Sequence, residues 1–170
     1  MIQRFTFGCP LPTESVVLPV EPAAAAVPYL TAEPDGSWSF SLAEDAVVYG
    51  LGEMPRGINK RGWHYVTDNT DESHHGENRL SYYGAHNFLL IDGGAGRSVF
   101  GVFVDFPGKV FYDIGYTRHD RLTFRTEEPD YDLYILTGDS PNAVCTEFRK
   151  LIGHSYIPPK WAFGFAQSRW

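Results

Sequence analysis

The sequence predicts an all-β fold, a β-sandwich or barrel with one short helix near the C-terminus. Its 170 residues include 12 Phe, 10 Tyr and 4 Trp, which favour strands, and 17 Gly and 12 Pro, which favour tight turns. Short segments of alternating apolar and polar residues follow one another with turn residues between them, which is typical of a sandwich or barrel. A chain of this length can bury a core without disulfides.

Ten strands are expected before the helix, and turn residues such as Pro107-Gly108 and Pro129-Asp130 separate them. Residues 22–28 form an alanine-rich link that is bounded by prolines and is too short for a stable helix. The expected strands span residues 3–7, 15–18, 37–42, 46–51, 63–68, 87–91, 98–106, 109–114, 122–125 and 131–136.

One helix is expected between Ser140 and Gly153. Ser140 is placed as the N-cap, Pro141 occupies the first helical position, and Gly153 follows the last turn. The spacing i, i+4, i+7 and i+8 puts four apolar residues on one face, which should pack on a sheet: Val144, Phe148, Leu151 and Ile152.

Composition and charge argue against several classes of partner. The formal net charge of −7 and the lack of a Lys and Arg stripe argue against nucleic acid. No run of about 20 apolar residues is present to span a membrane, and the first residues lack the apolar stretch of a signal peptide, so we expect a cytoplasmic protein. Cys9 and Cys145 suggest neither a disulfide framework nor a metal site.

The polar stretch over residues 68–86 is the main candidate for a binding loop, because loops of this length are often functional. Its acids, amides and hydroxyls suit sugar hydroxyls, and Tyr82 and Tyr83 could stack on a sugar face. A solvated connection is the alternative. His74 and His75 stand beside acidic residues, but adjacent His side chains diverge and no recognised ligand spacing is met, so neither a metal nor a cofactor is expected.

Residues 49–53, Tyr-Gly-Leu-Gly-Glu, lack the third glycine and the following helix of a dinucleotide motif, so a tight strand-to-turn backbone explains them better. With residues 158–170, Pro-Pro-Lys-Trp-Ala-Phe-Gly-Phe-Ala-Gln-Ser-Arg-Trp, they resemble family 31 glycoside hydrolases, chiefly α-glucosidases. The second motif is the more specific. Residues 83–88, 100–103 and 132–134 fall between them in the family's order, and the resemblance extends from about Val47 to the end.

The resemblance implies a galactose-mutarotase-like supersandwich over residues 1–157. Residues 158–170 would be a linker and the first strand, over 161–166, of a truncated (β/α)₈ barrel, which needs roughly 250 residues when complete. The family's two catalytic aspartates lie on later barrel strands, and the nucleophile motif Trp-x-Asp-Met-Asn-Glu does not occur in this sequence. No catalytic residue is therefore expected here, and the chain alone should be inactive.

Two parts of the family's sugar site map onto this sequence. Thr70 and Asp71 match the sugar-contacting positions of the long loop, with Asp68 as the alternative. Arg169 and Trp170 would lie at the carboxyl end of the first barrel strand, where barrel enzymes place their active sites. A core position is the alternative for Trp170.

The resemblance implies a parent enzyme that is a retaining α-glucosidase, in which one aspartate attacks the sugar and another serves as acid and base. Its partners would be a short α-glucoside oligosaccharide and the missing barrel. A free-standing carbohydrate-binding module is one alternative, and exposed coplanar Trp or Tyr rings on a sheet face would favour it. An aldose mutarotase is another, with His86 and Glu53 facing one sugar.

The last segment would lack its barrel neighbours. Its aromatic face, formed by Trp161, Phe163 and Phe165, and its open strand edge would both need a covering surface. We expect it either to pack on its own sandwich or to pair with another copy of the chain, which would make a homo-oligomer.

Overall fold

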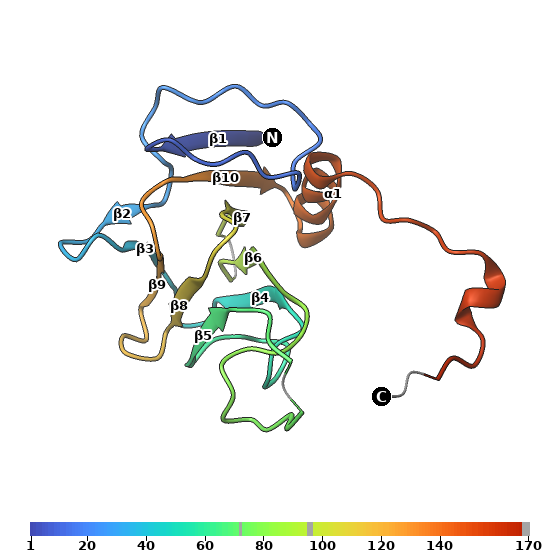
Figure 1. The fold of residues 1–170 in the computed structure, drawn as a ribbon. Helices are drawn as coiled ribbons and strands as arrows, with labels where there is room; N and C mark the ends of the chain where they lie inside the picture. Colours follow the sequence, from blue (N-terminus) through green and yellow to red (C-terminus); the bar gives the residue numbers. More distant parts are fainter. Residues whose placement is uncertain (72, 95–96, 168–170) are drawn as a thin grey trace.

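Two five-stranded antiparallel sheets pack face to face in the computed structural model, which describes residues 1–71, 73–94 and 97–167 (Figure 1). Sheet I has the strand order β1-β10-β7-β6-β4 and sheet II the order β2-β3-β9-β8-β5. The strands are β1 Ile2–Phe7, β2 Thr31–Ala32, β3 Trp38–Ser41, β4 Val47–Gly52, β5 Trp63–Thr67, β6 Ala85–Asp92, β7 Val99–Asp105, β8 Val110–Ile114, β9 Arg121–Thr126 and β10 Tyr131–Gly138. The predicted all-β sandwich is confirmed.

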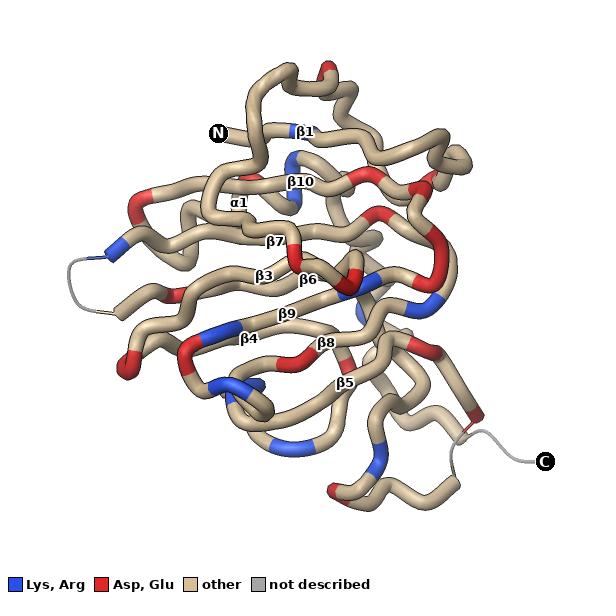
Figure 2. The backbone as a smooth tube through the Cα atoms, turned by 90° about the vertical axis from the view of Figure 1, so that its left-hand side faces the viewer, with Lys and Arg blue, Asp and Glu red and all other residues tan. Residues whose placement is uncertain are grey.

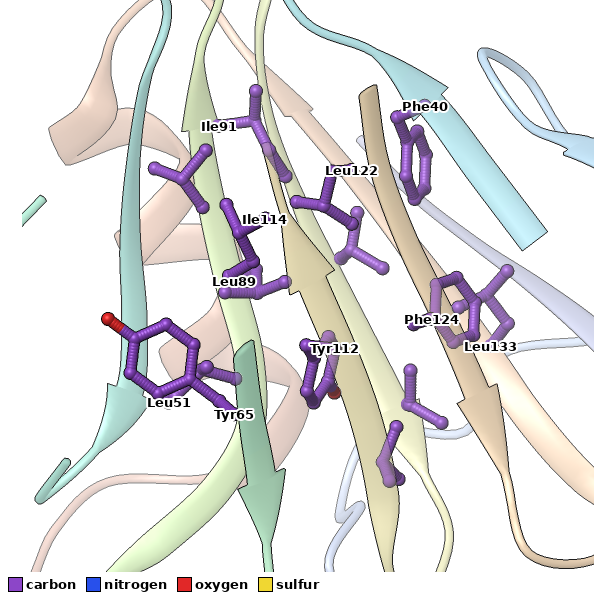
Figure 3. Packing of buried hydrophobic residues seen from close by; sticks show 14 of the residues in the cluster. Phe40, Leu51, Tyr65, Leu89, Ile91, Tyr112, Ile114, Leu122, Phe124 and Leu133 are labelled. Carbon is purple, nitrogen blue, oxygen red and sulfur yellow. The ribbon is translucent and has the colours of Figure 1, made fainter. Parts of the chain in front are cut away.

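The main core lies between the two sheets. Alternate residues of each strand point inward, as the pleat requires, and those of β6, β7 and β10 meet those of β3, β5, β8 and β9 (Figure 3). The largest fully buried side chains in this layer are Phe40, Leu51, Tyr65, Leu89, Ile91, Ile114, Leu122, Phe124, Leu133 and Ile135.

The predicted helix is α1, Pro141–Ile152, and it covers the outer face of sheet I (Figure 1). The Ser140 hydroxyl accepts a hydrogen bond from the Ala143 N–H at 3.2 Å, and Gly153 follows the helix with φ 86°, so both predicted ends are confirmed. Phe148 stacks on Phe88 with ring centroids 3.8 Å apart. A second apolar cluster results, formed by Phe88, Leu90, Phe103, Tyr134, Leu136, Val144 and Leu151.

The strand predicted over residues 15–18 is wrong. The N–H groups of Val17 and Leu18 donate to the carbonyl oxygen of Leu151, at 2.9 and 3.2 Å, and so satisfy the C-terminal end of α1. Residues 8–20 form a strap over the outer face of sheet I beside the helix. The apolar pattern of residues 15–18 therefore reflects contact with the helix end.

The end of the chain also differs from its prediction. A single turn of 3-10 helix, Lys160–Phe163, overlaps the strand that was expected over residues 161–166. The segment extends away from the sandwich (Figure 1). Trp161 and Phe165 are 81% and 95% exposed, so the segment does not pack on its own sandwich. No described strand lies beside it to pair with its backbone. Pairing with another copy and the domain boundary at residue 158 stay predictions.

The motif over residues 49–53 forms a bulge at the end of β4. Gly50, Leu51 and Gly52 have φ values of 125°, 64° and 71°, and the register with β6 shifts between the two glycines. A Cβ atom at Gly50 would lie 2.2 Å from the carbonyl oxygen of Phe88. The structural interpretation of this motif is confirmed, because the bulge brings the two backbones into contact.

Gly52→Ala is expected to lower the free energy of unfolding by more than Gly36→Ala. Both glycines have a similar positive φ, 71° and 81°, so alanine at either position bears left-handed strain of about 1–2 kcal/mol. A Cβ at position 52 would also lie 2.2 Å from the carbonyl oxygen of Gly84, whereas position 36 has no heavy atom within 4 Å. Urea unfolding of both variants measures the difference, and equal losses would contradict the role of the close approach.

Two neighbouring carboxylates lie beneath the strap, because Asp105 of β7 and Asp132 of β10 are register partners. Arg4 of β1 pairs with Asp132 through Nε and Nη2 at 3.0 and 2.8 Å. The Thr13 hydroxyl donates to Asp105 at 2.6 Å. Burial, together with the negative charge of Asp132, raises the pKa of Asp105.

The free energy of unfolding of Asp105→Asn, minus that of the protein with Asp105, is expected to increase as the pH rises from 4 to 7. The raised pKa means that the folded state holds more protons than the unfolded chain above the ordinary pKa of aspartate, so the unfolding free energy falls as Asp105 ionises. Asparagine does not titrate and escapes this loss. Urea unfolding across this range tests it, with Glu128→Gln at an exposed carboxylate as control. A gain independent of pH would refute the attribution.

Candidate substrate-contacting loop

The candidate loop, residues 68–84, leaves β5 and returns to β6 as a two-sided arm (Figure 1). The Thr70 N–H donates to the carbonyl oxygen of Tyr82 at 3.3 Å, and the Val66 N–H donates to that of Leu80 at 3.2 Å. The Asn69 side-chain oxygen accepts from the Ala85 N–H at 2.6 Å. These bonds hold the outgoing and returning segments side by side, so the position of Thr70 is set by the sandwich.

A buried polar contact anchors the base of the arm. The Thr67 hydroxyl at the end of β5 donates to the Asn87 side-chain oxygen of β6 at 2.5 Å and accepts from the Val110 N–H at 3.2 Å. The Asn87 amide donates to the carbonyl oxygen of Phe106 at 3.3 Å. Thr67 and Asn87 thus tie the loop to strands of both sheets. The sequence analysis did not identify Thr67 and Asn87 as anchors of the loop. A polar residue within an expected strand can nevertheless indicate a side-chain hydrogen bond of this kind.

Tyr82 and Tyr83 stabilise the tip of the arm. The Tyr82 hydroxyl donates to the carbonyl oxygen of Gly76 at 3.0 Å. The His75 ring lies 5.0 Å from the Tyr82 ring and 5.4 Å from the Tyr83 ring, with the second pair edge-on. These contacts give both tyrosines a structural role in the loop, beside the sugar stacking that the sequence suggests.

Thr70 and Asp71 lie exposed on the arm. The Thr70 hydroxyl and the Asp71 carboxylate form no hydrogen bond or ion pair within the part of the chain that the structure describes. The backbone at Thr70 is fixed while its side chain is free. The two predicted contact residues are therefore available to a ligand without the loss of an existing interaction.

Asp68 is engaged in an interaction of its own. Its carboxylate pairs with the Lys109 ammonium at 3.0 Å, and this hydrogen bond raises the pKa of Lys109. The Asp68 N–H donates to the Ser81 hydroxyl at 3.3 Å. A ligand would have to compete with Lys109 for this carboxylate, so the geometry favours Asp71 over Asp68. Arg169 and Trp170, the other predicted contacts, lie outside the described residues.

The two residues of the mutarotase alternative flank the bulge at the end of β4. The Glu53 N–H donates to the carbonyl oxygen of Gly84 at 2.8 Å, and His86 follows two residues later on β6. The His86 Nδ1 accepts from the Phe88 N–H at 3.3 Å, which leaves Nε2 as the protonated nitrogen of the neutral ring. Part of the His86 side chain is exposed, but desolvation by the residues packed around it lowers the pKa of His86.

Basic residues are scattered among acidic ones along the backbone (Figure 2). Within the described ranges, no three His, Cys, Asp or Glu side chains lie close enough together to hold a metal ion. No helix of the described chain is both long and apolar enough to cross a membrane.

Thr67→Val is expected to lower the free energy of unfolding by about 1–3 kcal/mol, because Asn87 and the Val110 N–H lose a buried partner. Asp71→Ala, on the same arm, should change it by less than about 0.5 kcal/mol, because its carboxylate is exposed and unbonded. Urea unfolding of both variants gives the comparison. Equal effects would show that the anchor does not carry the stability of this region.

Comparison with protein families gives one match, over residues 26–113, to the Glycosyl hydrolase 31 N-terminal galactose mutarotase-like domain. The matched region runs from the segment before β2 to β8 and contains the whole arm. It begins well before Val47, where the sequence resemblance was placed.

Several relatives are glycosidases of different specificity. Alpha-glucosidase 2 of Bacillus thermoamyloliquefaciens is 33% identical over 134 residues, which cover 77% of this chain and 16% of the relative. Alpha-xylosidase XylQ of Lactiplantibacillus pentosus is 32% identical over 73% of this chain and 15% of its own. The chain therefore spans about a sixth of the length of these relatives.

A solved structure of a GH31 enzyme also matches this chain. The Flavobacterium johnsoniae GH31 dextranase, complexed with glucose, matches with a TM-score of 0.68 and 25% identity over 83% of this chain and 17% of the dextranase chain. The family match covers more than half of the chain and includes strands of both sheets. The chain therefore belongs to the glycosyl hydrolase 31 N-terminal galactose mutarotase-like domains.

Proposed function

We propose that this chain is the substrate-contacting amino-terminal domain of a retaining α-glucosidase that hydrolyses terminal α-glucosidic bonds of short oligosaccharides. The sandwich would support the arm, and the arm would contact the sugar. The catalytic residues would be supplied by a (β/α)₈ barrel of the same polypeptide. The relatives named alpha-glucosidases support this specificity, and the relative named an alpha-xylosidase marks the main competitor.

The observation that carries the proposal is the state of Thr70 and Asp71. An arm fixed by backbone hydrogen bonds presents a hydroxyl and a carboxylate that no described residue engages. A carboxylate accepts hydrogen bonds from sugar hydroxyls, and bonds to a charged group are stronger than bonds between neutral groups. Because the arm is already ordered by its anchor, little conformational entropy would be lost when a sugar binds.

Retaining hydrolysis would need two carboxyl groups about 5 to 5.5 Å apart, one as nucleophile and one as acid and then base. We assign neither role to a residue of this chain. Asp71 would instead orient the substrate by holding a hydroxyl, which affects how often the anomeric carbon meets the nucleophile. The isolated 170-residue chain is accordingly expected to leave aryl α-glucosides intact.

Asp71→Ala in the enzyme that carries this domain is expected to lower kcat/KM for an aryl α-glucoside by about 2- to 150-fold, the range for a lost hydrogen bond of about 0.5–3 kcal/mol. Glu128→Ala, at an exposed carboxylate on the turn before β10, is the matched control and should leave the rate unchanged.

Steady-state rates on paired aryl α-glucoside and α-xyloside substrates test both the contact role of Asp71 and the substrate preference of the enzyme. Unchanged kinetics in Asp71→Ala would return the arm to a solvated connection. Faster hydrolysis of the xyloside than of the glucoside would reject the α-glucosidase assignment while keeping the contact role of Asp71.

A further inference from the structure

The turn between β4 and β5 carries two cationic side chains, Arg56 and Lys60, that form no ion pair with any carboxylate of the described residues. Lys60 is 5% exposed, and its Nζ makes one long hydrogen bond, 3.4 Å to the carbonyl oxygen of Pro55. Burial and then the positive charge of Arg56 lower the pKa of Lys60, against a smaller opposite effect of Glu77. A buried ammonium is costly unless it is paired, so this arrangement calls for an anionic partner.

Arg56 is held beside Lys60 but is only partly satisfied. Its Nη1 donates to the carbonyl oxygen of His64 at 3.0 Å, and its guanidinium lies 4.3 Å from the Trp63 ring centroid and 5.3 Å from that of Tyr65. Its buried Nε and the buried Tyr65 hydroxyl form no hydrogen bond of good geometry, although Arg56 lies close enough to Tyr65 to oppose the rise in the pKa of Tyr65 that burial causes. Buried polar groups of this kind generally have a partner, such as an ion or a water.

The backbone of Arg56 is strained in addition. Its φ of 71° lies in the left-handed region, which long side chains seldom adopt. Strain of this kind persists where the surrounding structure imposes it, often at sites that bind ligands. The turn thus holds the guanidinium in a fixed position over the aromatic rings.

Both cations line a groove of about 740 Å³ that extends to the start of α1. Pro141, the first residue of the helix, borders the groove, and no acid lies in the first helical turn, so the positive end of the helix dipole adds to the potential there. His86 also lines the groove with Nε2 as a possible donor. None of the described residues that line this groove is an Asp or a Glu.

We propose that this groove is a binding site for a small oxyanion, a phosphate or carboxylate group, held by Arg56 and Lys60. The charged groups of the site donate hydrogen bonds, which matches a ligand that only accepts them. A neutral sugar would find no charged acceptor among these lining side chains and gains less from Arg56 and Lys60 than an anion does. The Arg56 guanidinium can donate two parallel hydrogen bonds to an oxyanion, and the Lys60 ammonium adds a compact positive charge.

The test is a titration of the ¹⁵N-labelled chain with inorganic phosphate, acetate and glucose at constant ionic strength, followed by amide NMR shifts. Saturable shifts at residues 56–60 are expected with phosphate or acetate, and none with glucose. A response to phosphate alone would assign the site to phosphate groups, and a response to acetate would assign it to carboxylates. No saturable shift with either anion would overturn the proposal.

Two variants connect the binding to the named side chains. Arg56→Asn removes the guanidinium with a residue that tolerates the left-handed backbone, and Lys60→Met removes the ammonium at similar length. Each is expected to weaken anion binding at least tenfold, whereas Arg118→Gln, at an exposed arginine on the β8–β9 turn, should leave it unchanged. If Lys60→Met fails to fold, the anion affinity of Arg56→Asn alone tests the assignment. Undiminished binding in a folded variant would refute the assignment.

The outcome is independent of the role of the arm. Anion binding measured on this chain requires no glycosidase activity, and loss of the site would leave the kinetic test of Asp71 intact. Phosphate also stabilises many proteins without a specific site, so a rise in Tm counts as support only if Arg56→Asn abolishes it.

Discussion

Sheet I buries side chains on both of its faces, and the elements around it are arranged to meet that requirement. The inner face packs on sheet II, while the outer face would expose Phe88, Leu90 and Leu136 to water if nothing covered it. Burying one such side chain stabilises the fold by about 1.5–3 kcal/mol, so a second covering layer has a strong driving force. The helix α1 supplies part of that layer and the strap over residues 8–20 supplies the rest.

Every strand except β2 could be predicted from the sequence, because the turn residues and apolar patterns agree with the final sheet positions; the two-residue β2, Thr31–Ala32, is too short to leave such a pattern. The helix was equally clear, since its N-cap, its proline and its apolar stripe all indicate the same boundaries. Residues 15–18 show the limit of local patterns. Val-Val-Leu favours a strand, but the backbone donors of Val17 and Leu18 are used by the helix end, a partner distant in sequence. Trp161 and Phe163 likewise carry a strand pattern, but none of the described strands lies beside them.

The candidate site was predictable only in part. The loop length and polarity indicated a binding segment, and the resemblance pointed to Thr70 and Asp71, whose side chains the structure leaves free. The ion pair of Asp68 depends on Lys109, a residue that the sheet register brings close, so no local pattern could reveal it. That Lys60 is buried without an ion pair to a described carboxylate is invisible in the sequence for the same reason, since it depends on which side chains the fold brings close.

The pairing of β1 with β10 has a consequence for how the protein is made. Among the described strands, β1 comes before all the others in the chain, yet its neighbour in sheet I is β10, and Arg4 pairs with Asp132 across 128 positions of chain. During synthesis, β1 must wait until nearly all of the domain has been translated before it can dock. The edge of β1 that faces β10 stays open throughout that interval, whereas the opposite edge can already accept a hydrogen bond from the Ala23 N–H. A pause in translation before residue 131 would therefore leave a chain whose earliest strand is free to pair with a neighbour on the same messenger.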